Sequence, residues 1–327
     1  MISRALLGLA AAALLASPGA SQEVAGNPNQ PPEHKAPFPN LGTGQSRAEA
    51  MKSFELAPHM QRGVPAKDML EQQRRLDKAL GALQPQRPGT VDAYVLTVAL
   101  DSDPVFAREA REAERVLSRR YGAEGRSLVL AGPDGKRDDL PKGSIRSFLI
   151  GLARIAEVMD AEEDVLVLYT TSHGAKVGLV NHYGDTGYGI FSPTRLKETL
   201  EDLGIERRLL IISACYSGVF VEPLKSPDTA ILTAASAERN SFGCVAENDW
   251  TFYGDALINN ALRKPQSLAD AADEATLKIA GWETDRRLLA SLPQTAIGAD
   301  VDEWLDELES RTPQVATTPV GRPAIGE

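Results

Sequence analysis

Continuous apolar runs alternate along this chain with segments whose apolar residues recur every three or four positions. Runs of four to ten residues without such spacing predict strands that are covered on both faces. These runs lie at 91–100, 127–131, 164–171, 209–214 and 231–235. The segments with helical spacing lie at 104–121, 144–159, 193–203, 251–262 and 267–282. Repeated alternation of strand and helix predicts an α/β fold, in which a mostly parallel sheet has helices on both faces.

The two ends of the chain differ from this alternation. Residues 1–21 carry Arg4, an apolar run at 5–16 and then small residues, a pattern typical of a secretory signal peptide. The apolar run is shorter than the roughly twenty residues that span a bilayer. We therefore expect no stable membrane insertion after signal cleavage. Because no cysteine follows the run for lipid attachment, we expect a periplasmic or secreted protein.

Composition divides the rest of the chain into four segments. Residues 22–45 are rich in proline and polar residues and are expected to form a flexible leader. Residues 46–89 have helical spacing and predict a helical arm that packs on the main domain or covers its cleft. The main domain is expected at 90–295. Residues 296–327 predict a short acidic helix followed by a proline-rich tail.

A cysteine and a histidine each follow an apolar strand of the predicted sheet. Cys215 ends the run LLIISAC, and His173 ends the run DVLVLYTTSH. A lone buried cysteine or histidine is more often structural than catalytic. However, the carboxyl ends of parallel strands meet at one edge of a sheet, where such folds bind ligands. Because a catalytic thiolate needs an imidazole within hydrogen-bond reach, the pair predicts a nucleophile and its base.

Charge and residue counts exclude several other classes. The formal net charge of −10 offers no basic surface for nucleic acid. Two cysteines are too few for a disulfide framework, so we expect two free thiols. The four histidines show no spacing that pairs with the cysteines as metal ligands, so we expect neither a metal nor another cofactor.

The chain resembles the legumain family of cysteine peptidases, which are relatives of the caspases. The resemblance rests on strand-His-Gly at 173–174, on Ala-Cys-x-Ser-Gly at 214–218 about forty residues later, and on ILTAASAERNSFGC at 231–244. It implies a caspase-like three-layer αβα sandwich and a bacterial exported member of the family. It also implies that Cys215 is the nucleophile, that His173 is the base, and that the backbone amides of Gly174 and Cys215 bind the oxyanion.

The same resemblance implies a pocket for the side chain at the cleaved bond. Family members that cut after asparagine have a glutamate two residues before the nucleophile, where this chain has Ser213. Ser241 and Asp255 match other pocket positions, and Arg108 lies near the position of a pocket arginine. The alternatives are a solvated Arg108 and an Asp255 that stabilises a helix N-terminus. We expect cleavage after asparagine, with a basic residue as the second candidate.

These observations together predict an exported cysteine endopeptidase that acts on a peptide or protein through a thioester acyl-enzyme. Two alternatives stay open. An amine in place of water would resolve the thioester in a transpeptidase or ligase. A non-catalytic binding protein could also retain the caspase-like fold.

Overall fold

A computed structural model of the protein describes residues 46–49, 64–132, 139–183 and 187–325. The expected signal peptide and leader lie outside the described residues, as does part of the helical arm at 50–63. Among the described residues, no helix combines the length and the apolar character needed to cross a membrane.

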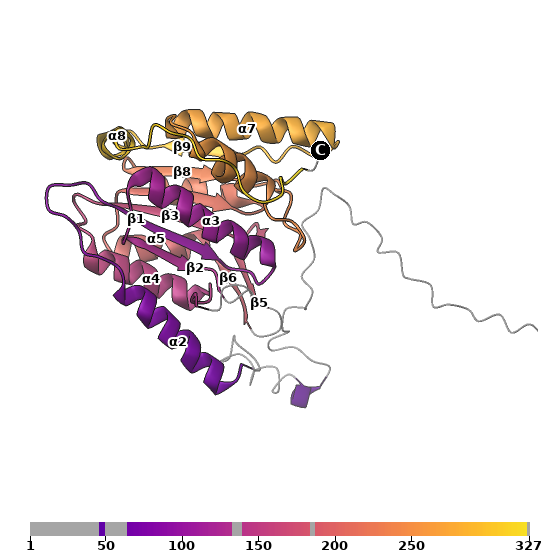
Figure 1. The fold of residues 1–327 in the computed structure, drawn as a ribbon. Coiled ribbons are helices and arrows are strands. Elements are labelled where there is room, and N and C mark those ends of the chain that lie inside the picture. Colours follow the sequence, from indigo (N-terminus) through magenta and orange to yellow (C-terminus); the bar gives the residue numbers. More distant parts are fainter. Residues whose placement is uncertain (1–45, 50–63, 133–138, 184–186, 326–327) are drawn as a thin grey trace, which may run out of the picture.

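A six-stranded sheet forms the centre of the molecule, in the order β2-β1-β3-β7-β8-β9 (Figure 1). All pairs are parallel except β8 with β9, which are antiparallel. The expected mostly parallel sheet is thus confirmed, and the edge strand β9 is an addition to it. The strands are β1 (Ala93–Ala99), β2 (Ser127–Leu130), β3 (Val165–Thr171), β7 (Arg208–Ser213), β8 (Thr229–Thr233) and β9 (Gln294–Ile297).

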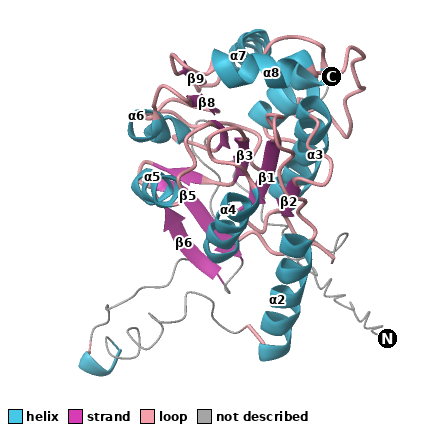
Figure 2. Cartoon of the chain, turned by 90° about the vertical axis from the view of Figure 1, so that its left-hand side faces the viewer, coloured by secondary structure: helices cyan, strands magenta, loops and turns pink. Residues whose placement is uncertain are grey.

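Helices cover both faces of this sheet, as Figure 2 shows for α4 and α5 on one side and α3 and α8 on the other. Successive side chains of a strand point to opposite faces. Leu210 accordingly packs in the core cluster with α2, α4 and α5, while Leu209 and Ile211 pack in the cluster with α3, α7 and α8. The three-layer arrangement is therefore confirmed. The helices are α2 (Ala66–Gly81), α3 (Pro104–Tyr121), α4 (Ile145–Val158), α5 (Pro193–Asp202), α6 (Val221–Leu224), α7 (Leu268–Asp285) and α8 (Asp302–Ser310).

Helix α3 begins and ends at the predicted residues. Pro104 occupies its first turn, where the missing N–H costs nothing, and Gly122 ends it with a left-handed φ of 65°. The segment predicted as a helix at 251–262 differs from the expectation. It forms a π-helix, η2 (Gly254–Asn260), followed by a single 3₁₀ turn, η3 (Ala261–Arg263).

A smaller antiparallel sheet lies beside the carboxyl ends of the central strands. It consists of β4 (Gly174–Ala175), β5 (Gly178–Tyr183) and β6 (Gly187–Phe191). Residues 178–190 alternate apolar, aromatic and glycine residues, a pattern typical of such a hairpin. The amide of Val180 donates to the carbonyl of His173 at 2.9 Å, so this sheet continues directly from the tip of β3.

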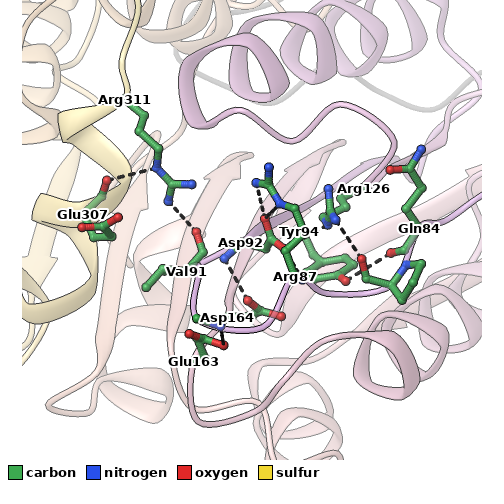
Figure 3. Close-up of polar contacts among 12 residues, drawn as sticks. Gln84, Arg87, Val91, Asp92, Tyr94, Arg126, Glu163, Asp164, Glu307 and Arg311 are labelled. Carbon is green, nitrogen blue, oxygen red and sulfur yellow. Dashed lines mark hydrogen bonds and ion pairs between the residues drawn. The ribbon is translucent and has the colours of Figure 1, made fainter.

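Buried charges close the opposite, amino-terminal edge of the central sheet (Figure 3). The carboxylate of Asp92 accepts hydrogen bonds from the backbone and side chain of Arg87 and lies 3.2 Å from Nε of Arg126. The Asp92 amide donates to Asp164 at 2.8 Å. Burial raises the pKa of Asp164 and raises the pKa of Tyr94 to about 12. These contacts connect the residues after α2 to the starts of β1 and β3.

Candidate active site

The tips of β3 and β7 bring His173 and Cys215 to the same edge of the sheet. The two strands are parallel, with Thr171 opposite Ser213 in the register. The pairing continues beyond the strands, because the Ser172 amide donates to the Ser213 carbonyl at 3.2 Å. His173 directly follows Ser172, and Cys215 lies two residues after Ser213.

Gly174 fixes how closely these two tips approach. A Cβ atom at this position would lie 1.9 Å from the carbonyl oxygen of Cys215 and 3.0 Å from Cβ of Ala214. Real Cβ atoms do not make such short contacts, so the approach requires glycine. Tyr216, directly after Cys215, has a φ of 57°, a left-handed conformation that is uncommon for a non-glycine residue and is enriched at functional sites.

The Cys215 thiol is buried but lies among polar groups. Its side chain is 1% exposed, and the Ser241 amide donates to Sγ at 3.3 Å. A hydrogen bond from Cys244 lowers the pKa of Cys215 most, and the Ser241 amide and the positive charge of His173 lower it further against the effect of burial. The hydrogen bond to Cys215, followed by burial, raises the pKa of Cys244 well above its ordinary value. Both thiols are free.

The imidazole of His173 is held on several sides and is 2% exposed. The ring of Phe106 meets it edge-on, with 5.0 Å between the ring centroids. Its Nε2 lies 3.5 Å from Oδ2 of Asp103. Asp101 belongs to the same cluster. One ring nitrogen of His173 and one carboxylate oxygen from each of Asp101 and Asp103 all lie within 4.8 Å of one another.

The predicted pocket residues fall into two groups in the structure. Ser213 and Ser241 lie beside the nucleophile, since Ser213 precedes it on β7 and the backbone of Ser241 contacts its sulfur. Arg108 instead donates to the carbonyls of Ala246 and Asn248 and lies 3.6 Å from Asp249. The Arg108 side chain is 24% exposed, and the 246–249 segment holds it rather than solvent alone.

Asp255 is 2% exposed, and hydrogen-bond donors occupy both of its carboxylate oxygens. Oδ1 accepts from the side-chain amides of Asn259 and Asn260 at 2.8 and 3.0 Å. Oδ2 accepts from the backbone amide of Ala324 at 2.8 Å. The carboxylate thus connects the π-helix η2 to the C-terminal tail.

The tail runs along the segment that precedes η2. Trp250 donates from its indole nitrogen to the Val320 carbonyl at 2.8 Å, and the Arg322 amide donates to Asp249 at 2.8 Å. The side chain of Arg322 also contacts Asp249, and this hydrogen bond lowers the pKa of the Asp249 carboxyl. Ala324 lines an open pocket of about 600 Å³ whose other walls include Phe242 and Gly243, next to Ser241.

Sequence reasoning missed Glu109, which lies behind the proposed pocket. This carboxylate is fully buried and accepts hydrogen bonds from Tyr169, from Thr171 at 2.8 Å, from Ser213 at 3.0 Å and from the Thr251 amide at 2.9 Å. In a helix rich in arginine and glutamate it resembles a surface residue. Its position four residues after Val105 and four before Ala113, both buried, is the signal that would have placed it on the inner face.

Comparisons with known proteins found solved structures and one family model that are similar to this chain. Among solved structures, the crystal structure of caspase-1 from Spodoptera frugiperda is similar, with 13% sequence identity and a TM-score of 0.45. That match covers 66% of this chain and 93% of the other. None of the curated proteins matches this chain. A family model described as the peptidase C13 family matches residues 147–298, a range that contains His173, Ser213, Cys215, Ser241 and Asp255. Residues 147–298, which carry Cys215 and His173, therefore belong to the peptidase C13 family, the legumain family of cysteine-type peptidases.

Proposed function

We propose that this cysteine peptidase is an exported endopeptidase that uses Cys215 as nucleophile and His173 as general base. The observation that carries the proposal is that the parallel strands β3 and β7 end side by side, shortly before His173 and Cys215. The lowered pKa of Cys215, caused first by its hydrogen bond from Cys244, agrees with it. A lowered thiol pKa increases the fraction of thiolate, which is the reactive form.

In the proposed reaction, the Cys215 thiolate attacks the peptide carbonyl while His173 carries the proton taken from the thiol. The backbone amides of Gly174 and Cys215 stabilise the oxyanion. His173 then protonates the leaving amine, and water hydrolyses the thioester. Sγ is buried and contacts the Ser241 backbone, so the peptide must displace residues around Ser241 before attack.

For specificity, we propose asparagine at the cleaved bond, recognised by Ser213, Ser241 and Asp255. Asp255 supports this because its oxygens accept hydrogen bonds from neutral amides, the groups that an asparagine side chain offers. Substrate would have to replace the present partners of Asp255, among them Ala324. Arg108 favours the second candidate, a basic side chain, because it contacts the 246–249 loop and leaves the charge of Asp255 to other partners.

The test of the nucleophile and base is digestion of a peptide library, read by mass spectrometry. Wild type is expected to cleave, Cys215→Ala to lose all turnover, and His173→Ala to lose nearly all. Full activity in purified Cys215→Ala would refute the assignment. An added amine that appears in the product mass would favour the transpeptidase or ligase alternative, and a wild type that neither cleaves nor is alkylated at Cys215 would favour the binding protein.

The pocket needs a separate measurement. Wild type and Asp255→Ala are compared on matched substrates with asparagine, aspartate, lysine or arginine at the cleaved bond. A changed preference in the variant is expected, and an unchanged one would remove Asp255 from the pocket. Export rests on the sequence of residues 1–21, and N-terminal sequencing of the protein recovered outside the cytoplasm tests it by locating cleavage near residue 21.

A further inference from the structure

Asp103 stands at the N-cap position of α3, but its carboxylate does not cap that helix. Aspartate at this position ordinarily accepts a hydrogen bond from an amide of the first turn. The Asp103 side chain makes no such bond. Its Oδ2 lies instead 3.5 Å from Nε2 of His173. A side chain well suited to capping is thus directed to the imidazole of the proposed base.

The loop that carries Asp103 is held in place by the small sheet. The Asp103 amide donates to Oδ1 of Asp101 at 2.9 Å, and the other oxygen of Asp101 lies 3.6 Å from Nδ1 of His182 on β5. Backbone bonds repeat this connection, since the Ser102 amide donates to the His182 carbonyl at 2.9 Å. Phe106, on the first turn of α3, packs edge-on against the His173 ring. The carboxylate and the ring are therefore positioned by the same helix start.

The contact at Nε2 determines what each ring nitrogen can do. With Nε2–H facing a carboxylate, Nδ1 is the nitrogen that takes the proton from the Cys215 thiol. That transfer breaks the S–H bond, forms an N–H bond at Nδ1, and leaves a thiolate and an imidazolium. A carboxylate beside Nε2 stabilises the imidazolium and holds the ring in this orientation. Contacts of this kind are often long before substrate binds and tighten in the substrate complex.

We propose that Asp103 is a positioning residue, which orients His173 and stabilises its protonated form for the proposed peptidase reaction. The proposal rests on the proposed roles of Cys215 and His173. Titratable groups near the imidazole include Cys215, which follows β7, and Asp101 and Asp103, which follow β1, while His182 on β5 lies against Asp101. Among these groups, Asp103 forms an ion-pair contact with the ring of His173.

The test compares Asp103→Asn and Asp103→Glu with wild type. Asparagine caps helices as well as aspartate does, so Asp103→Asn removes the charge and retains the capping ability. For Asp103→Asn we expect kcat on a peptide substrate to fall about 10- to 100-fold, while KM stays within about twofold of the wild-type value. A loss of this size is what weakening a general base produces. Asp103→Glu is expected to recover activity to within about tenfold of wild type. Asp302→Asn, which removes an exposed acid from the first turn of α8, is the matched control and is expected to be neutral.

The decisive readout is the rate of Cys215 alkylation by iodoacetamide as a function of pH. Loss of the Asp103 charge weakens the imidazolium that stabilises the thiolate, so the midpoint of the profile is expected to move up by about one pH unit. A folded Asp103→Asn protein with the wild-type profile and wild-type kcat would overturn the proposal. Lower activity with a lower Tm and an unmoved profile would also overturn it, because that result indicates a structural role. The profile needs no turnover, so it tests Asp103 even where wild type does not cleave peptides. A wild type with neither turnover nor alkylation at Cys215 would refute the proposed function itself.

Discussion

Replacing Glu109 with alanine is expected to produce one of the largest losses of stability in this domain. The change removes the acceptor for four buried donors, namely Tyr169, Thr171, Ser213 and the Thr251 amide. A buried donor left without a partner costs about 1–3 kcal/mol. The Ser213 hydroxyl lies 3.3 Å from the Thr251 hydroxyl and can turn to it. The Tyr169 hydroxyl and the Thr251 amide have less freedom to turn.

Counting two unsatisfied donors and a small cavity gives an expected loss of about 3–5 kcal/mol in the free energy of unfolding. This is a large part of the roughly 5–15 kcal/mol that stabilises a typical domain. Burial, followed by the Glu109 charge, raises the pKa of Tyr169 well above its ordinary value, so Tyr169 stays a donor across the accessible pH range. Glu109→Gln keeps the shape but directs an amide N–H₂ group at these donors, and we expect about half the loss.

Urea unfolding followed by tryptophan fluorescence measures this difference. The matched control is Glu198→Ala, an exposed glutamate on α5, which is expected to change stability by less than about 0.5 kcal/mol. A free energy of unfolding for Glu109→Ala within about 1 kcal/mol of wild type, roughly the cost of a single hydrogen bond, would show that the buried carboxylate does not hold these elements together.

Three further changes test other parts of the site. Gly174→Ala places a methyl group against the Cys215 carbonyl, so thermal unfolding is expected to reveal at least about 2 kcal/mol of lost stability, and an unchanged Tm would contradict the close approach of the two tips. Cys244→Ala removes the largest cause of the lowered Cys215 pKa, so the midpoint of Cys215 alkylation is expected to move to higher pH, and a midpoint that stays in place would exclude that hydrogen bond. The Asp249 pKa is lowered in the folded protein, so its contact with Arg322 contributes stability above the ordinary value of 3.8 and loses it as the pH falls below that value. The protection of backbone amides at residues 320–324 from hydrogen exchange, relative to their intrinsic rates, is therefore expected to fall in acid, while Arg322→Ala would show low protection at every pH.

The sequence allowed the sheet and its chemical edge to be predicted because both depend on local pattern. Apolar runs identify the strands. Because β3 and β7 are parallel neighbours, the residues that follow the two strands lie close to each other. Pro104 and Gly122 mark the ends of α3 for equally local reasons. The family resemblance added the roles of Cys215 and His173, which spacing alone leaves as one interpretation among several.

The remaining features depend on contacts between distant parts of the chain. Asp255 and its neighbours form a π-helix, in which the amides of Asn259 and Asn260 bond to the same carboxylate oxygen. No periodicity distinguishes this segment from an ordinary helix. Strand β9 is short and mostly exposed, so it lacks an apolar run. Arg108 contacts three residues about 140 positions later in the chain, and the pattern of residues in its own helix does not predict these contacts.

The attachment of the C-terminal tail has a practical consequence for producing this protein. Affinity tags on exported proteins are commonly placed at the C-terminus, since cleavage of a signal peptide would remove an N-terminal one. Only three residues would separate a tag joined after Glu327 from Ala324, whose amide donates a hydrogen bond to Asp255. Its charge and bulk would act on the same carboxylate that is proposed to select the substrate. Tagged and tag-cleaved protein are therefore different samples for any measurement of specificity.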